Sequence, residues 1–230
     1  MKIKILYEDK DILAIDKPSG IMVHPDGRDK NKDKTILDLF IKKYPKMEIV
    51  HRLDRDTSGV LLLAKNAKAH EFLKKQFMDR NIKKTYVAFV AGHINNEKGK
   101  INKPIGRSPS DFRRRLAGRG ARGEMREAIT EYTVLKRFTS PQPSPYKGEG
   151  VKFTYVEIFP KTGRTHQIRV HMKYINHPVV CDSLYDPKGF CPKEIKRLAL
   201  HAKSIEFRNL KEKIIKVESP LPKEFEKMLA

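Results

Sequence analysis

Apolar residues recur along the chain in short segments, either alternating with polar residues or spaced three and four positions apart. Alternation and short apolar runs predict strands, whereas the wider spacing predicts helices, because these are the repeats of the two structures. The pattern predicts strands at 3–7, 12–15, 59–64, 86–91, 128–137 and 151–159, and helices at 35–44, 67–79 and 164–174. Thr35 stands where it can cap the first of these helices. This mixture is typical of an α+β fold, with a mixed, mainly antiparallel sheet flanked by helices.

The segment 107–126 follows neither pattern and is strongly basic. Its acidic residues are Asp111 and Glu124, and its arginines are Arg107, Arg113, Arg114, Arg115, Arg119, Arg122 and Arg126. Three glycines loosen the backbone, so we expect a mobile basic arm. Guanidinium groups bind phosphate bidentately and stack on bases, which favours a nucleic-acid contact over the alternative of a solvated charged loop.

A second irregular segment, 139–150, contains Pro141, Pro143 and Pro145. This composition predicts a semi-rigid, extended connection between the two strands of a hairpin, with no core of its own. We interpret it as an inserted loop without chemistry.

Composition adds a large positive charge. The chain has 49 lysines and arginines against 28 acidic residues, a net charge of +21, which indicates a polyanionic partner. RNA, DNA and an anionic membrane all remain open on charge alone. The membrane is the least favoured, because no apolar window is long enough to span a bilayer. Acidic residues come too early for a signal peptide, so we expect a soluble, cytoplasmic protein.

Length bears on the number of domains, and cysteine content bears on disulfide bonds and metal sites. A length of 230 residues is ordinary for one domain, and we expect a single domain over 1–230. The two cysteines, Cys181 and Cys191, form no disulfide framework, and their spacing is not that of a paired zinc knuckle. We interpret both as free thiols; a bridge or a metal site is the less favoured alternative.

The run His-Arg-Leu-Asp-Arg-Asp-Thr-Ser-Gly at 51–59 carries the clearest candidate chemistry. It places Asp54 among arginines directly before the apolar residues 60–64. A neighbouring guanidinium favours the ionised form of a carboxylate, which suits a nucleophile or base that faces an anionic substrate. On these residues alone, a solvated charged turn that leads into a buried strand is an equally good interpretation.

Other motifs lie before and after this run along the chain. They are Asp-Lys-Pro-Ser-Gly at 16–20, Lys-Thr-Tyr-Val-Ala at 84–88 and Gly-Arg-Thr-His-Gln-Ile-Arg-Val-His at 163–171, with shorter motifs at 104–107, 198–202 and 219–222. Together with the run at 51–59, they resemble the RluA-type pseudouridine synthases over nearly the whole chain. The resemblance implies the pseudouridine synthase fold with its long bent sheet, and the isomerisation of uridine to pseudouridine in RNA without a cofactor.

The resemblance also assigns roles to individual residues. Asp54 would be the catalytic carboxylate, with Asp56 ranked well below it; Tyr86 would stack on the flipped base or reach a proton, and Arg169 would keep Asp54 ionised and oriented. Arg52 would fill the gap left by the extruded base, the alternative being a salt bridge to Asp54 or Asp56. Substrate contacts are expected from Arg107, Arg113, Arg114, Arg115, Arg164, His166 and Ile168. We interpret His24, His171 and His201 as structural, and expect no metal beside the arginines near His51.

Departures from the family's pattern are local. Cys181 and Asp186 stand where the family commonly has glycine. The chain begins at the catalytic domain, so we expect a compact, monomeric member that acts on transfer RNA or on stem-loops of large-subunit ribosomal RNA. The alternative is a non-catalytic RNA-binding or ribosome-assembly factor on the same fold. RNA cleavage is disfavoured because the chain lacks a paired-histidine or metal-carboxylate constellation.

Overall fold

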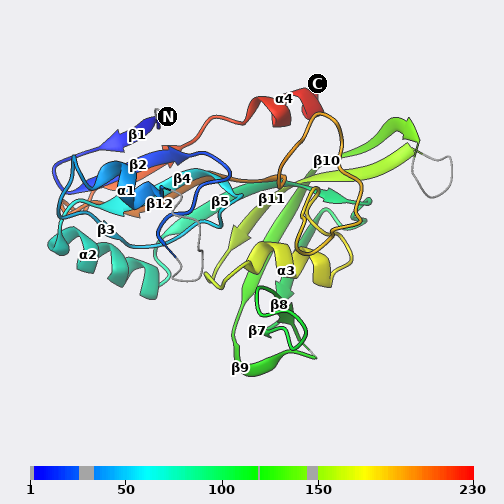
Figure 1. Cartoon of the computed structure of the whole chain (residues 1–230), viewed down its shortest axis with the longest axis horizontal. Helices are drawn as coiled ribbons and strands as arrows, with labels where there is room; N and C mark the ends of the chain where they lie inside the picture. Colours follow the sequence, from blue (N-terminus) through cyan, green and yellow to red (C-terminus); the bar gives the residue numbers. More distant parts are fainter. Residues whose placement is uncertain (1–2, 26–33, 119, 144–149) are drawn as a thin grey trace. The chain divides into compact units, whose positions relative to one another are not determined.

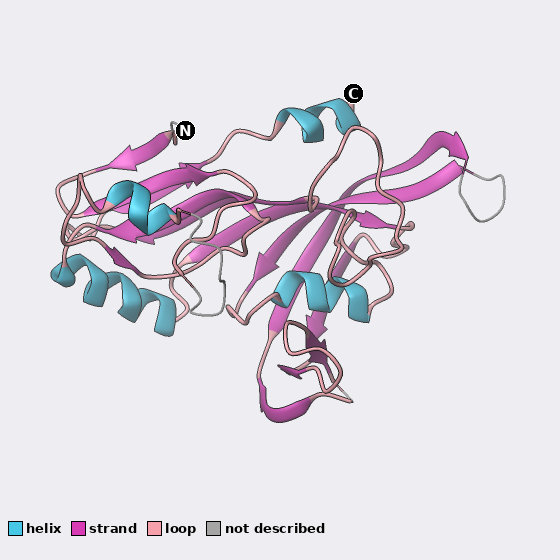
Figure 2. Cartoon of the chain, viewed as in Figure 1, coloured by secondary structure: helices cyan, strands magenta, loops and turns pink. Residues whose placement is uncertain are grey.

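The apolar runs of the sequence form the central strands of two units (Figure 1). The computed structural model describes residues 3–25, 34–118, 120–143 and 150–230. The first unit comprises Met1–Lys84 and Ala202–Pro220, and the second comprises Thr85–His201 and Leu221–Ala230. Each unit combines antiparallel strands with helices (Figure 2). No helix in the described ranges is both long enough and apolar enough to cross a bilayer.

The strands of the first unit follow the order β1, β2, β4, β12, while β3 pairs with β4 and β13 with β12. Their bounds are β1 Ile5–Glu8, β2 Ile12–Lys17, β3 Glu48–Ile49, β4 Ser58–Ala64, β12 Leu200–Arg208 and β13 Ile214–Glu218. β2 and β4 run antiparallel, with Ile15 opposite Leu61. Every residue of β4 is buried, which explains why this strand is a continuous apolar run rather than an alternating one.

Side-chain caps fix where the two helices of this unit begin. In α1 (Ile36–Phe40), Thr35 Oγ1 accepts from the Asp38 amide while the Asp38 carboxylate accepts from the Thr35 amide. The predicted cap is confirmed, although the helix ends before residue 44. In α2 (Ala67–Met78), the Asn66 side chain accepts from the Ala69 amide at 2.9 Å. The apolar face of α2 packs on the core formed by β2 and β4.

The second unit has the strand order β5, β11, β10, β6 and holds α3 and α4. The bounds are β5 Lys83–Ala91, β6 Lys98–Asn102, β10 Ile129–Pro143, β11 Gly150–Pro160, α3 Gln167–Tyr174 and α4 Lys223–Leu229. Phe89 lies at the centre of its core, with ring centroids 4.9 Å from Tyr155 and 5.2 Å from Phe225. The predicted strands are confirmed, and the pairing of β10 with β11 continues to Pro143 and Gly150. The rest of the Pro-rich connection, 144–149, lies outside the described residues.

The basic arm contains a small sheet of its own, with strand order β8, β7, β9. The strands are β7 Ile105–Arg107, β8 Arg115–Ala117 and β9 Arg122–Arg126. Antiparallel pairing places Arg107 opposite Arg115 in one direction and opposite Arg122 in the other. The arm is therefore regular where the sequence predicted a loosened backbone. A positive φ of 74° at Gly123 shows one reason for the glycines, which permit the twists of this ribbon.

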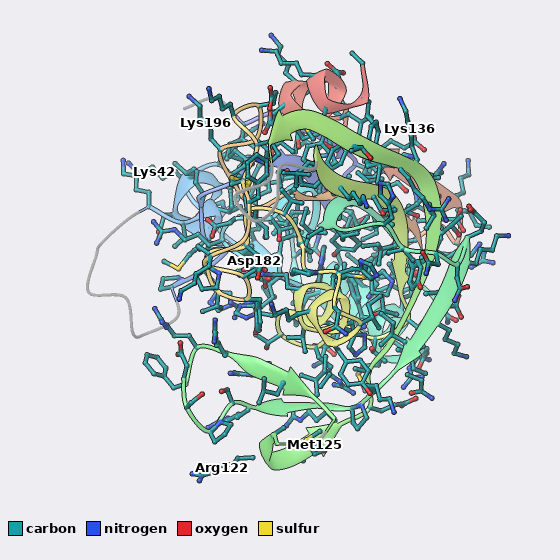
Figure 3. All side chains as sticks on the ribbon, turned by 90° about the vertical axis from the view of Figure 1, so that its right-hand side faces the viewer. Lys42, Arg122, Met125, Lys136, Asp182 and Lys196 are labelled. Carbon is teal, nitrogen blue, oxygen red and sulfur yellow. A yellow bond between two sulfur atoms is a disulfide. The ribbon has the colours of Figure 1, made fainter. Side chains whose placement is uncertain are left out.

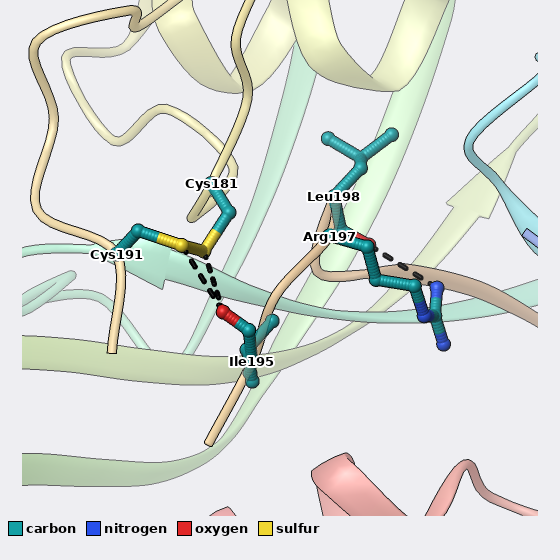
Figure 4. The surroundings of a disulfide bond; sticks show 5 residues. All are labelled: Cys181, Cys191, Ile195, Arg197 and Leu198. Atoms are coloured by element: carbon teal, nitrogen blue, oxygen red, sulfur yellow. Dashed lines mark hydrogen bonds between the residues drawn. A yellow bond between two sulfur atoms is a disulfide. The ribbon is translucent and has the colours of Figure 1, made fainter. Parts of the chain in front are cut away.

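The prediction of free thiols is wrong, because Cys181 and Cys191 form a disulfide (Figure 4). Their Cα atoms are 4.9 Å apart, and both sulfur atoms approach the carbonyl oxygen of Ile195, at 3.3 and 3.1 Å. Cys181 has φ 57°, a left-handed conformation that favours glycine. Spacing alone could not reveal the bond, since it depends on how this turn brings the chain back on itself.

Candidate active site

The loop that carries Asp54 lies directly before β4 in the first unit. Asp54 is half-buried, and its carbonyl oxygen accepts a hydrogen bond from the Thr57 amide at 3.1 Å, which closes a turn. Because β4 begins only at Ser58, Asp54 and Asp56 both belong to this turn. The alternation of a strand therefore does not place the two carboxylates on one face.

A buried lysine fixes the backbone of this loop. Lys17 is fully buried, and its Nζ donates to the carbonyl oxygens of Pro18, Ile21 and Arg55 at 2.9, 2.8 and 2.9 Å. A buried ammonium needs a partner for each of its three N–H groups, and these carbonyls supply them. The turn after β2 and the residue after Asp54 are thereby tied to one charge.

Further hydrogen bonds join the same two segments. The Gly20 amide donates to the Arg55 carbonyl at 2.9 Å, Arg55 Nε donates to the Gly20 carbonyl at 3.1 Å, and Ser19 Oγ donates to the Asp56 carbonyl at 2.7 Å. Gly20 has φ 88°, which a residue with a side chain rarely adopts. The motif at 16–20 therefore acts as a cradle for the Asp54 loop.

His51, at the start of the loop, has a structural role. Its Nε2 accepts from the Leu62 amide at 2.9 Å, and its ring lies 4.9 Å from that of Phe77. Burial, helped by the charge of Lys84, lowers the pKa of His51 to about 3, so the ring is neutral near pH 7. Burial also lowers the pKa of Lys84 to about 8. Neither property was predicted from the sequence.

Arg52 is exposed, as a residue that enters a nucleic-acid stack must be. Its Nη1 lies 3.5 Å from His24 Nε2. The wedge role of Arg52 and its alternative, a salt bridge to Asp54 or Asp56, both stay predictions.

Tyr86 and Arg169 belong to the second unit. Tyr86 lies on β5 opposite Ile158 of β11, half-buried and packed against the core. Arg169, on α3, is buried, and its Nε and Nη2 each donate to one oxygen of Asp182 at 2.7 Å. Asp182 is a partner that the sequence reasoning missed. The predicted pairing of Arg169 with Asp54 joins residues of different units and stays a prediction.

The start of α3 differs from the predicted helix at 164–174. His166 has φ 56°, so the helix begins at Gln167 and His166 is not on its face. Gln167 holds the preceding turn, since its Oε1 accepts from Thr162 Oγ1 at 2.7 Å and from the Arg164 amide at 3.0 Å. Ile168 is buried in the core cluster, and its contact with uracil stays a prediction.

A basic pocket of about 410 Å³ lies between the small sheet and this turn. It is lined by Ile105, Gly106, Arg107, Arg115, Gly123, Glu124, Arg126, Gly163, Arg164 and Thr165. Arg164 Nε is fixed by the Glu127 carbonyl at 3.0 Å and Arg126 by Glu124 at 2.9 Å, whereas the exposed Arg107 has no side-chain partner among the described residues. Arginines outnumber acids in this lining, so it can bind phosphate.

The other arginines of the arm differ in their contacts. Arg113 is exposed and pairs with Asp111 at 2.8 Å, which lowers the pKa of Asp111 to about 2. Arg114 donates through Nε and Nη2 to the Leu184 carbonyl, and Arg115 Nη1 donates to the Phe112 carbonyl at 3.1 Å. Arg113 is thus exposed but held by Asp111 through Nε and Nη2, while Arg114 helps to hold the arm in place.

The interpretation of His171 as structural agrees with its contacts. Its Nδ1 lies 2.8 Å from Thr130 Oγ1, and its Nε2 lies 2.9 Å from the Lys103 carbonyl. Among the residues that the structure describes, no group of three or more His, Cys, Asp or Glu side chains could hold a metal ion.

A model of the RNA pseudouridylate synthase family matches residues 11–174. The chain belongs to this family. It is 34% identical to the uncharacterized RNA pseudouridine synthase YlyB of Bacillus subtilis, over 100% of this chain and 72% of that protein. It is 37% identical to the dual-specificity RNA pseudouridine synthase RluA of Vibrio parahaemolyticus, over 88% of this chain and 76% of that one. It is 36% identical to the ribosomal large subunit pseudouridine synthase D of Borreliella burgdorferi, over 97% of this chain and 66% of that protein.

Solved structures of the same family confirm the α+β fold. The human RNA pseudouridylate synthase domain containing 1 superposes with a TM-score of 0.76 at 26% identity, over 96% of this chain and 84% of that one. The human RNA pseudouridylate synthase domain containing 4 superposes with a TM-score of 0.74 at 25% identity, over 98% of this chain and 91% of that one. Both segments that Lys17 ties together, 16–20 and 51–59, lie within the residues that the family model matches.

The Lys17 contacts predict a large loss of stability in Lys17→Met. The variant leaves carbonyl groups in a buried place without their donor, at about 1–3 kcal/mol for each group left unsatisfied. We expect urea denaturation to show unfolding easier by about 2–4 kcal/mol. Lys42→Met, at an exposed lysine of the same unit, should change stability by less than about 0.5 kcal/mol. Equal effects of the two substitutions would contradict the clamp.

The low pKa of His51 predicts an acid-sensitive fold. Between its ordinary pKa of 6.5 and the folded value of about 3, the unfolded chain binds a proton that the folded chain does not. Stability should therefore fall as the pH drops through this range, by about 1.4 kcal/mol per pH unit from this residue. His51→Gln keeps an acceptor but no titrating group. Unfolding measured between pH 6 and 4 should depend on pH less steeply in the variant, and identical slopes would refute the assignment.

Proposed function

We propose that this chain isomerises uridine to pseudouridine in structured RNA, with Asp54 as the catalytic carboxylate. The observation that carries the proposal is the cradle of the Asp54 loop, in which one family motif holds the backbone of another. The finer expectations belong to the same proposal: a monomer in the cytoplasm that acts, without a cofactor, on transfer RNA or on a large-subunit ribosomal stem-loop.

The reaction defines what the site must supply. The bond between N1 of uracil and C1′ of ribose breaks, a bond between C5 and C1′ forms, C5 loses a proton and N1 gains one. An ionised carboxylate near the sugar can act as nucleophile or base in this sequence. We assign that role to Asp54, and assign stacking on the base or proton transfer to Tyr86. Arg169 supplies the positive charge that keeps Asp54 ionised and oriented.

Access to the base requires its extrusion from the stem, which costs a few kcal/mol in a paired context. The exposed guanidinium of Arg52 is suited to the gap that remains, because its flat surface can stack between neighbouring bases. We propose that Arg52 is this wedge.

We further propose that the small sheet of the arm binds the RNA backbone. Arg107, Arg115 and Arg164 line its pocket, and Arg113 is exposed beside it in sequence. His166, at the turn before α3, belongs to the same surface in our proposal, whereas Arg114 acts mainly through the Leu184 carbonyl.

Two experiments test the proposed function. Pseudouridine maps of total RNA with and without the gene identify the target, which should lose its modification in the mutant. Purified protein should then release tritium from RNA that is labelled at C5 of uracil. Binding of the same RNA without tritium release would favour a non-catalytic RNA-binding or assembly factor.

For the nucleophile, we predict that Asp54→Asn abolishes tritium release while the affinity for RNA stays within about twofold. The amide keeps the shape of the side chain but not its charge or nucleophilicity. Asp56→Asn is the matched control, in the same turn, and should retain turnover. Measurable turnover of Asp54→Asn above a preparation without enzyme would refute the role of Asp54.

For the arm, we predict that Arg107→Gln combined with Arg113→Gln weakens RNA binding and flattens its salt dependence. For each phosphate interaction removed, the slope of log affinity against log salt concentration should decrease by roughly 0.7–0.9. The single-turnover rate at saturating RNA should change less than the affinity. Arg208→Gln, at an exposed arginine of β12, serves as the control. A slope equal to that of the unmodified protein would show that the arm is only a charged surface.

A further inference from the structure

The segment between Cys181 and Asp186 connects two parts of the proposed site within the second unit. The side chain of Asp182 on this segment is fully buried. Figure 3 labels Asp182 near the middle of the view and Arg122 at its bottom, beside the small sheet. Both carboxylate oxygens of Asp182 accept from Arg169, and Oδ1 also accepts from the amides of Leu184 and Tyr185 at 3.0 Å each. The carboxylate is therefore fixed by its own backbone, and it fixes the guanidinium in turn.

Tyr185 extends these contacts to the arm. Its ring lies 5.1 Å from the guanidinium carbon of Arg169, and its hydroxyl accepts from the Arg115 amide at 2.9 Å. The same hydroxyl shares a hydrogen bond of 2.9 Å with His166 Nδ1. One side chain thus contacts helix α3, the turn before it and strand β8.

A disulfide bond anchors the first residue of this segment. Cys181, directly before Asp182, is joined to Cys191 (Figure 4). At its other end Lys173 of α3 pairs with Asp186 at 3.0 Å. Asp182 and Tyr185 are consequently held between two anchors, which restricts the directions in which Arg169 can point.

We propose that Asp182 and Tyr185 are positioning residues for the isomerisation: Asp182 sets the orientation of the Arg169 guanidinium, and Tyr185 couples that guanidinium to the basic arm. This inference rests on the proposed function, in which Arg169 serves Asp54. Engagement of the RNA backbone by the arm and the orientation of Arg169 are then determined by the same short segment.

The test of Tyr185 uses two tyrosines of the second unit that are equally buried, each 6% exposed. Tyr185→Phe keeps the ring and removes the hydroxyl, and Tyr155→Phe is the control, because its hydroxyl has no hydrogen-bond partner in the described residues. We expect Tyr185→Phe to raise the KM for RNA about tenfold, the effect of removing one or two buried hydrogen bonds, with kcat changed less than about twofold. A purely structural role would instead lower the melting temperature and leave KM unchanged.

The test of Asp182 is a double-mutant cycle with Arg169→Met, read by single-turnover rates. If Asp182 acts through Arg169, Asp182→Asn slows the intact protein but has no further effect once Arg169 is replaced. Because Asp182→Asn leaves a buried guanidinium without its partner, its fold must be checked by thermal unfolding. Arg169→Met/Asp182→Leu replaces the pair with apolar side chains and provides a folded reference with the same expected rate as Arg169→Met.

The outcomes separate this inference from the function on which it rests. The inference would be wrong if the rate losses of Asp182→Asn and Arg169→Met multiplied in the double variant. It would also be wrong if Tyr185→Phe and Tyr155→Phe had identical kinetics. Either result is compatible with an active unmodified protein. An unmodified protein that releases no tritium would overturn both.

Discussion

The position of the proposed catalytic carboxylate depends on one buried charge, the ammonium group of Lys17. Burial of a charge is costly unless each of its N–H groups finds an acceptor, and here the acceptors are carbonyls of the turn after β2 and of Arg55. Lys17 also pairs with Gly59 in the ladder between β2 and β4. Gly59 has φ 111°, and a Cβ there would collide with the backbone of Ala202, so the strand cannot shift to another register. The Asp54 loop is therefore held at the end of a rigid ladder, as a precise site requires.

Much of this arrangement could be predicted from local sequence. Periodicity located β4 and the hairpin of β10 and β11, because their apolar residues reflect burial directly. The capping box of Thr35 follows from residue types three positions apart. The motifs named the residues of the candidate site and the family. Helix boundaries were predicted less well: the left-handed conformation of His166 starts α3 later than its periodicity indicates, since backbone geometry there is set by Gln167 and not by the apolar pattern.

What the sequence could not reveal depends on contacts between distant residues. Lys17 appeared only as part of a turn motif, because its acceptors include a carbonyl 38 residues away. Asp182 lies 13 residues beyond Arg169, outside any spacing rule that would pair them. The disulfide is of the same kind, since a separation of 10 residues is compatible with free thiols until the turn at Cys181 is known. Each of these three features satisfies or links groups that the local sequence pattern leaves open. Lys17 and Asp182 also contact segments or residues that the motifs had already named.

Amide hydrogen exchange measures the rigidity of the Asp54 loop most directly. The amides of Gly20 and Thr57 donate to the Arg55 and Asp54 carbonyls, at 2.9 and 3.1 Å, within the loop and its cradle. If the Lys17 clamp holds the loop as one unit with the ladder, these two amides should exchange with the same free energy of opening as the central amides of β4. Exchange of Gly20 and Thr57 through local opening, at a much lower free energy than β4, would contradict the account.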